Sequence, residues 1–209
     1  MTLEARKERA KKILARLQKL HPDAHIALKY GSNWELLVAV ILSAQCTDVM
    51  VNKVTDKLFK KYKKLDDYVN ADQKEFEVDI KSTGFYHNKT NSVLKSAKIV
   101  KEKYKGKVPD TMEEILKLPG VARKTANVVL GNAYGIVKGI AVDTHVKRLS
   151  KQLGLTDNTD PVKIERDLMA VIPQKNWFKA TYMIIDYGRQ YCKARAHDHS
   201  KCPLAEFYI

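Results

Sequence analysis

The sequence is poor in cysteine, glycine and proline, and it contains no long apolar run. Its 209 residues include 3 cysteines, 9 glycines and 6 prolines. The cysteines, Cys46, Cys192 and Cys202, are few and odd in number, which argues against a disulfide framework and suits a reducing compartment. The longest strongly apolar run, Leu36 to Leu42, falls far short of the roughly 20 residues that span a bilayer. We therefore expect neither disulfides nor membrane insertion.

Acidic residues are the minority. The chain has 24 Asp and Glu against 38 Lys and Arg, a formal net charge of +14, while 44% of its residues are hydrophobic. That apolar content is typical of a folded globular protein. The charge predicts a polyanionic partner, nucleic acid before membranes, with solubility alone as the alternative. The N-terminal stretch MTLEARKERAKK lacks the apolar middle of a signal peptide, so we expect a cytoplasmic protein.

Apolar residues recur at helical spacing along nearly the whole chain. Val93, Ala97, Val100 and Tyr104 mark one such buried face. Segment 136–142 is apolar and β-branched but has no hairpin partner, so we expect a loop there and an all-α fold. The predicted helices cover about 3–20, 33–44, 49–62, 66–81, 87–104, 111–118, 123–134, 144–152, 160–172 and 176–190.

The segment LKLPGVARKTAN, residues 116–127, is the most informative part of the sequence. An apolar helix ends, Pro119-Gly120 makes a tight turn, and a second helix begins at once. Backbone N–H groups near Gly120 and Ala122 then point outward at a helix N-terminus, which suits a nucleic-acid phosphate. An ordinary helical hairpin is the alternative.

Lys124 and Asp143 are the candidate chemical groups. Lys124 lies at the positive end of the second helix and follows Arg123, and both effects favour the neutral amine that nucleophilic chemistry requires. A lysine that only contacts phosphate is the alternative. Asp143 follows an apolar pair and precedes a helix, so it can cap that helix and also act in catalysis.

Four segments together resemble the endonuclease III family of helix-hairpin-helix, Gly/Pro-Asp (HhH-GPD) DNA glycosylases. They are LPGVARKTANVVL, AVDTHVKRL, LSAQCTDVMVNKVT and STGFYHNKTNSV, and the match runs in order from about residue 30 to the end. The resemblance implies an all-α, two-lobed fold with a six-helix barrel domain over 24–136, containing the hairpin at about 111–134. A second helical domain would comprise 1–23 and 137–209. Duplex DNA with damaged bases or abasic sites would bind in the cleft between them, to a monomer associated with the nucleoid.

The same resemblance assigns roles to single residues. Lys124 would attack the sugar C1′ of a flipped nucleotide, and Asp143 would activate the amine and stabilise positive charge on the sugar. Gln45 would fill the gap left by the extruded base, and Phe85 would be the wedge where the family usually has leucine. The expected DNA contacts are Gln45, Phe85, Gly120, Val121, Ala122, Arg123, Thr125 and His145. Lys147 and Arg148 would also face the DNA or the mouth of the active site, with a solvated helix face as the alternative.

The C-terminus departs from the family, which ends in four cysteines that hold an iron-sulfur cluster. Counted at the family's spacing, the four positions here are Cys192, His199, Cys202 and Tyr208. Such clusters favour four thiolates, and although His can replace Cys, Tyr is a poor substitute. We therefore expect no cluster, no metal and no cofactor in the chemistry, only a loop packed by apolar contacts. A zinc ion held by Cys192, His197, His199 and Cys202 is the open alternative.

The expected function is that of a bifunctional DNA glycosylase and abasic-site lyase of base excision repair. It would remove oxidised or damaged pyrimidines and cleave the abasic site by β-elimination through a lysine Schiff base. A glycosylase for G·T or G·U mismatches and a non-catalytic helix-hairpin-helix DNA-binding protein are the alternatives.

Overall fold

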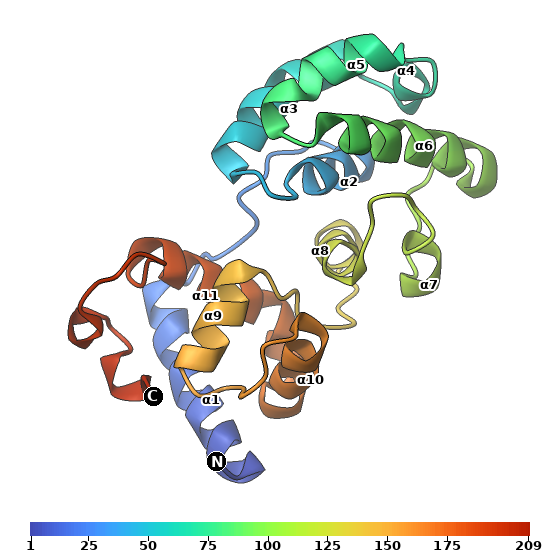
Figure 1. Cartoon of the computed structure of the whole chain (residues 1–209). Helices are drawn as coiled ribbons and strands as arrows, with labels where there is room; N and C mark the ends of the chain where they lie inside the picture. The colour runs from blue at the N-terminus through green and yellow to red at the C-terminus, as the bar shows by residue number, and fades with distance from the viewer. The chain divides into compact units, whose positions relative to one another are not determined.

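The structure, a computed structural model, describes all 209 residues and contains only helices and loops (Figure 1). The all-α prediction is therefore confirmed. No helix in it combines the length and the apolar character that crossing a membrane requires. The α-helices are α1 (Leu3–Leu20), α2 (Asn33–Leu42), α3 (Asp48–Lys61), α4 (Leu65–Val69), α5 (Gln73–Ile80), α6 (Tyr86–Tyr104), α7 (Met112–Ile115), α8 (Arg123–Tyr134), α9 (Thr144–Gln152), α10 (Pro161–Val171) and α11 (Trp177–Gln190).

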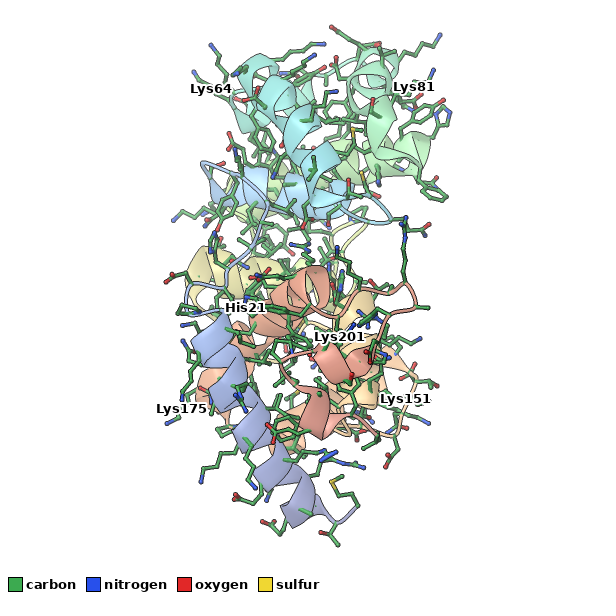
Figure 2. All side chains as sticks on the ribbon, turned by 90° about the vertical axis from the view of Figure 1, so that its left-hand side faces the viewer. His21, Lys64, Lys81, Lys151, Lys175 and Lys201 are labelled. Carbon is green, nitrogen blue, oxygen red and sulfur yellow. The ribbon has the colours of Figure 1, made fainter.

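The chain divides into two compact units. The central unit comprises Ala27–Ile136, and the terminal unit comprises Met1–Ile26 together with Val137–Ile209. Each unit has a surface rich in lysine. Figure 2 labels Lys64 and Lys81 in the central unit and Lys151, Lys175 and Lys201 in the terminal unit, and all five side chains are exposed.

The central unit is built on α2. Ser32 begins this helix by accepting a hydrogen bond from the Glu35 N–H, and Trp34 and every side chain from Leu36 to Leu42 are buried. A helix that is apolar on all sides must be covered on all sides, and α3, α6 and α8 pack against it. The apolar run that is too short to cross a membrane is thus the core of this unit.

The terminal unit joins the two ends of the chain. Helix α1 packs against α10 and α11, and Figure 1 shows it beside them. Its apolar side, including Ile13 and Leu17, enters a core with residues from α9, α10, α11 and the C-terminal loops. The Arg9 guanidinium donates to the carbonyls of Leu153 and Phe207, each at 3.0 Å. These contacts tie the first helix to the last residues of the chain.

Two helix predictions require correction. The helix expected over 66–81 is two helices, because Asp72 caps a new start, α5, by accepting from the Glu75 N–H. The helix expected over 111–118 is α-helical only over Met112–Ile115. Lys117 and Leu118 donate to carbonyls three residues back, so the end of this segment is a tighter turn. Segment 136–142 is a loop, as predicted.

Candidate active site

The hairpin of α7 and α8 is seated on α6 through a glycine. Gly120 has φ +78°, a left-handed conformation that favours glycine. A Cβ at this position would lie 2.7 Å from the Ser92 Cβ, so the missing side chain also makes room for α6. One helical turn along, the Ser96 hydroxyl donates to the Pro119 carbonyl at 3.1 Å. The glycine predicted to admit a phosphate is therefore required, first of all, by packing within the unit.

Lys124 lies in the first turn of α8, and its side chain is exposed. No side chain caps this helix, and its first turn contains no acidic residue. Ala122, the residue before α8, has φ −93°, which any residue adopts. Arg123 is exposed and Thr125 is half-buried, whereas the predicted DNA contact Val121 is buried. A positive helix end next to two cationic side chains suits an anion such as phosphate.

Asp143 caps α9 in the terminal unit. Its Oδ1 accepts a hydrogen bond from the Val146 N–H at 2.8 Å, and the side chain is half-buried. The cap uses one carboxylate oxygen and fixes the direction of the other. The capping role predicted for this residue is confirmed.

His145, in the first turn of α9, is half-buried and packs against α11. A Cβ on Gly188 would lie 2.6 Å from its Nδ1 atom, so the ring presses on the α11 backbone at that glycine. The expected DNA contact is therefore at least partly a packing residue.

Gln45, the predicted gap-filling residue, and Phe85, the predicted wedge, share an unusual backbone conformation. Their φ angles are 52° and 49°, in the left-handed region that non-glycine residues rarely adopt. Both side chains are exposed, and Phe85 retains 61% of its accessible surface. Left-handed backbone at exposed, non-glycine positions is a strain that proteins keep chiefly where a side chain has a task.

Lys89 connects these two segments and was not identified from the sequence. It is only 5% exposed, and its Nζ donates to the carbonyls of Leu42 and Thr83 at 2.8 Å each. Leu42 precedes the segment that carries Gln45, and Thr83 precedes the one that carries Phe85. Burial lowers the pKa of Lys89. The signal was present, because Lys89 lies four residues before Val93 on the buried face of α6.

Comparison with known proteins identifies the family. Residues 38–174 match the model of the HhH-GPD superfamily of base excision DNA repair proteins. The chain belongs to this superfamily.

Among its relatives in the superfamily, endonuclease III of Synechocystis is 51% identical over 203 residues, which cover 97% of this chain and 93% of that protein. Endonuclease III of Bacillus subtilis is 45% identical, covering 91% of this chain and 87% of its own length. The solved structure of a trapped endonuclease III–DNA covalent intermediate superposes with a TM-score of 0.92 at 43% identity, covering 100% of this chain and 96% of that one.

The C-terminal segment of this superfamily member corrects the expectation of a metal-free loop. One ligand atom from each of Cys192, His197, His199 and Cys202 lies within 4.8 Å of the others. The prediction of no metal and no cofactor is thus contradicted, since the segment gathers a set of metal donors. Counting by the family's spacing had placed Tyr208 in the set, and the structure places His197 there instead.

Arg148 was expected to face DNA or the mouth of the active site, but its guanidinium binds Cys192. Its guanidinium donates to the Cys192 carbonyl at 2.6 Å and to the Cys192 Sγ at 3.3 Å. It also donates to the Gln152 side chain at 3.0 Å. Arg148 therefore holds the start of the C-terminal segment against α9, whereas Lys147 is exposed.

Proposed function

We propose that this chain is a bifunctional DNA glycosylase and abasic-site lyase of base excision repair, removing oxidised or damaged pyrimidines from duplex DNA. The observation that carries the proposal is its likeness, over its whole length, to an endonuclease III solved as a trapped covalent intermediate with DNA. A covalent intermediate requires a nucleophile, and the chain has an exposed lysine at the N-terminus of the hairpin's second helix.

We infer that Lys124 is this nucleophile. Its neutral amine attacks C1′ of an extruded nucleotide, and the bond from C1′ to the base breaks with its electron pair leaving on the protonated base. The sugar ring then opens to a Schiff base between C1′ and the lysine nitrogen. The protonated imine acidifies C2′, so loss of a C2′ proton expels the phosphate from C3′ and cuts the strand. Water releases the lysine from the imine.

Asp143 supports the proposed attack as the carboxylate of the reaction. Its Oδ1 accepts a hydrogen bond from the α9 backbone, and this bond also fixes the direction of Oδ2. An anion held in this way can take the proton that the Lys124 ammonium must lose and can stabilise positive charge as the base departs.

The remaining predicted residues are proposed to hold the distorted DNA. Gln45 fills the gap in the duplex, since its amide both donates and accepts, and Phe85 unstacks the neighbouring base step. The backbone at Gly120, Val121 and Ala122 receives a phosphate with Arg123 and Thr125 beside it. His145 is proposed to contact DNA through the part of its ring that does not press on Gly188.

A trapping experiment tests the lyase. The protein is incubated with a duplex containing one abasic site and reduced with borohydride, and the covalent protein–DNA band is quantified. We expect the band in wild type, none in Lys124→Ala, and an undiminished band in Lys117→Ala, a matched exposed lysine from the same hairpin. Because Lys124 is exposed, its loss does not disturb the core. A band in Lys124→Ala, or binding without any band in wild type, contradicts the proposal.

Substrate location follows from the proposed activity. A protein that repairs duplex DNA works on the chromosome, so we propose a cytoplasmic protein associated with the nucleoid. Fluorescence microscopy of the tagged chain should show it coincident with stained DNA.

A further inference from the structure

The four donors of the C-terminal segment surround one point. The Cys192 Sγ lies 3.8 Å from the His199 Nδ1, and the Cys202 Sγ lies 3.4 Å from the His197 Nε2. All four ligand atoms lie within 4.8 Å of one another. Both cysteines are buried and unpaired by any disulfide. Two sulfurs and two imidazole nitrogens thus converge, with no disulfide between the sulfurs.

The two sulfur–nitrogen distances match a single tetrahedral ion. Bonds of about 2.0–2.1 Å to nitrogen and 2.3 Å to sulfur, at tetrahedral angles, place ligand atoms about 3.3–3.8 Å apart. Both sulfur–nitrogen distances, 3.8 and 3.4 Å, fall in this range. Two cysteines with two histidines are also a common donor set of structural zinc sites.

Neighbouring groups orient the donors. The His197 Nδ1 lies 2.8 Å from the Arg195 carbonyl, which fixes the hydrogen on Nδ1 and leaves the Nε2 lone pair facing Cys202. On the other side, the Arg148 guanidinium donates to the Cys192 Sγ, which holds that sulfur in place. The His199 ring is backed by the Tyr208 ring, with centroids 4.5 Å apart.

We propose that Cys192, His197, His199 and Cys202 bind one zinc ion, which closes the C-terminal segment onto the end of α11. The ion takes two thiolates and two neutral imidazoles, so binding releases protons from any donor that was protonated. Arg148 connects the site to α9. The site is structural, because all four tetrahedral positions belong to the protein.

The iron-sulfur cluster that the family resemblance implies does not fit this donor arrangement. A four-iron cluster is held at its corners by four thiolates, and this segment supplies two. A two-iron centre with two histidines places both sulfurs on one iron and both nitrogens on the other. Here each sulfur has an imidazole nitrogen within 3.8 Å, so thiolates and imidazoles are interleaved around a single position.

Metal analysis of the full chain tests the proposal. The protein, without a polyhistidine tag, is purified anaerobically from cells supplied with both iron and zinc, and zinc, iron and acid-labile sulfide are measured per chain. We expect about one zinc, with neither iron nor sulfide. His197→Ala and Cys202→Ser should lose the zinc, while the matched controls His25→Ala and Cys46→Ser keep it. Both histidines, 25 and 197, are exposed, so His197→Ala does not disturb the core.

Cobalt substitution gives a second readout. Cobalt bound to wild type should show the intense ligand-field bands of tetrahedral coordination and thiolate charge transfer, and both should weaken in Cys202→Ser but not in Cys46→Ser. Stoichiometric iron and sulfide would overturn the proposal in favour of a cluster. Wild type that retains no zinc after zinc addition and gel filtration, or equal zinc in His197→Ala and wild type, would overturn it as well.

Discussion

Asp143 caps α9 and is proposed to act in catalysis, and one substitution separates these two roles. Asparagine caps helices as well as aspartate does, so Asp143→Asn should keep the bond to the Val146 N–H and change stability by no more than about 1 kcal/mol. It removes the carboxylate, so the yield of borohydride-trapped complex in a timed reaction should fall by about 100-fold or more. Asp160→Asn is the matched control, since Asp160 caps α10 in the same way. Full activity in Asp143→Asn would reduce Asp143 to a cap.

Gly120 is needed for its φ angle and for the space beside it, and the two requirements can be measured apart. Gly120→Ala should lower the free energy of unfolding by about 1–3 kcal/mol in urea denaturation, because a Cβ meets Ser92. Gly135→Ala imposes the same left-handed strain at φ +67° with nothing within 4 Å, so it should cost less. Equal losses in the two variants would show that the contact with α6 is unimportant.

Single residues were predictable where local chemistry decides their place. The cap at Asp143 follows from the neighbouring residues alone. The family's cysteine spacing put Tyr208 in the expected ligand set and left His197 to the zinc alternative, whereas chain folding over 192–202 brings donors together at other intervals. Arg148 was misplaced for a related reason, since its partner Cys192 lies 44 residues away in sequence.

At the scale of elements, Lys89 is the connection between the end of α2 and the start of α6. The pKa of Lys89 is lowered chiefly by burial, with the Cys46 thiol a smaller, opposing influence. Folding therefore disfavours the charged amine, and this penalty disappears as pH rises from the lowered pKa to the ordinary value of 10.5.

The unfolding free energy of wild type, relative to Lys89→Met, should accordingly increase with pH across that window and level off above it. Urea denaturation at several alkaline pH values measures the difference, with Cys46→Ser in both proteins to remove the nearby thiol. At all pH values Lys89→Met should be the less stable, because the carbonyls of Leu42 and Thr83 lose their donor. A pH-independent difference would contradict the burial of a charged amine.

Most helices were predictable because their apolar faces repeat over several turns, as in α1, α6 and α11. The break between α4 and α5 was not, since the apolar spacing continues across it and only the cap at Asp72 marks the new start. The shortness of α7 is likewise a matter of packing, because its end is drawn into the turn that seats Gly120 on α6.

For the whole molecule, the net charge of +14 gives a prediction independent of chemistry. Affinity for an undamaged duplex should fall steeply between 50 and 200 mM salt, by about 1,000-fold if some six phosphates are contacted. Lys124→Gln should reduce the slope of log affinity against log salt by no more than about 1 while abolishing trapping. Fluorescence anisotropy of a labelled duplex measures both slopes. If the affinity for DNA did not change with salt, the net positive charge would serve solubility and not DNA binding.

The pairing of α1 with the C-terminal segment has a consequence for synthesis on the ribosome. Translation delivers α1 first, yet its partners in α10, α11 and the last residues emerge only at the end. Residues Ala27–Ile136 form a contiguous unit, so they can fold while the rest of the chain is still being made. The apolar side of α1, with Ile13 and Leu17, meanwhile remains exposed to solvent. The terminal unit can therefore close only after α10 and α11 have been synthesised.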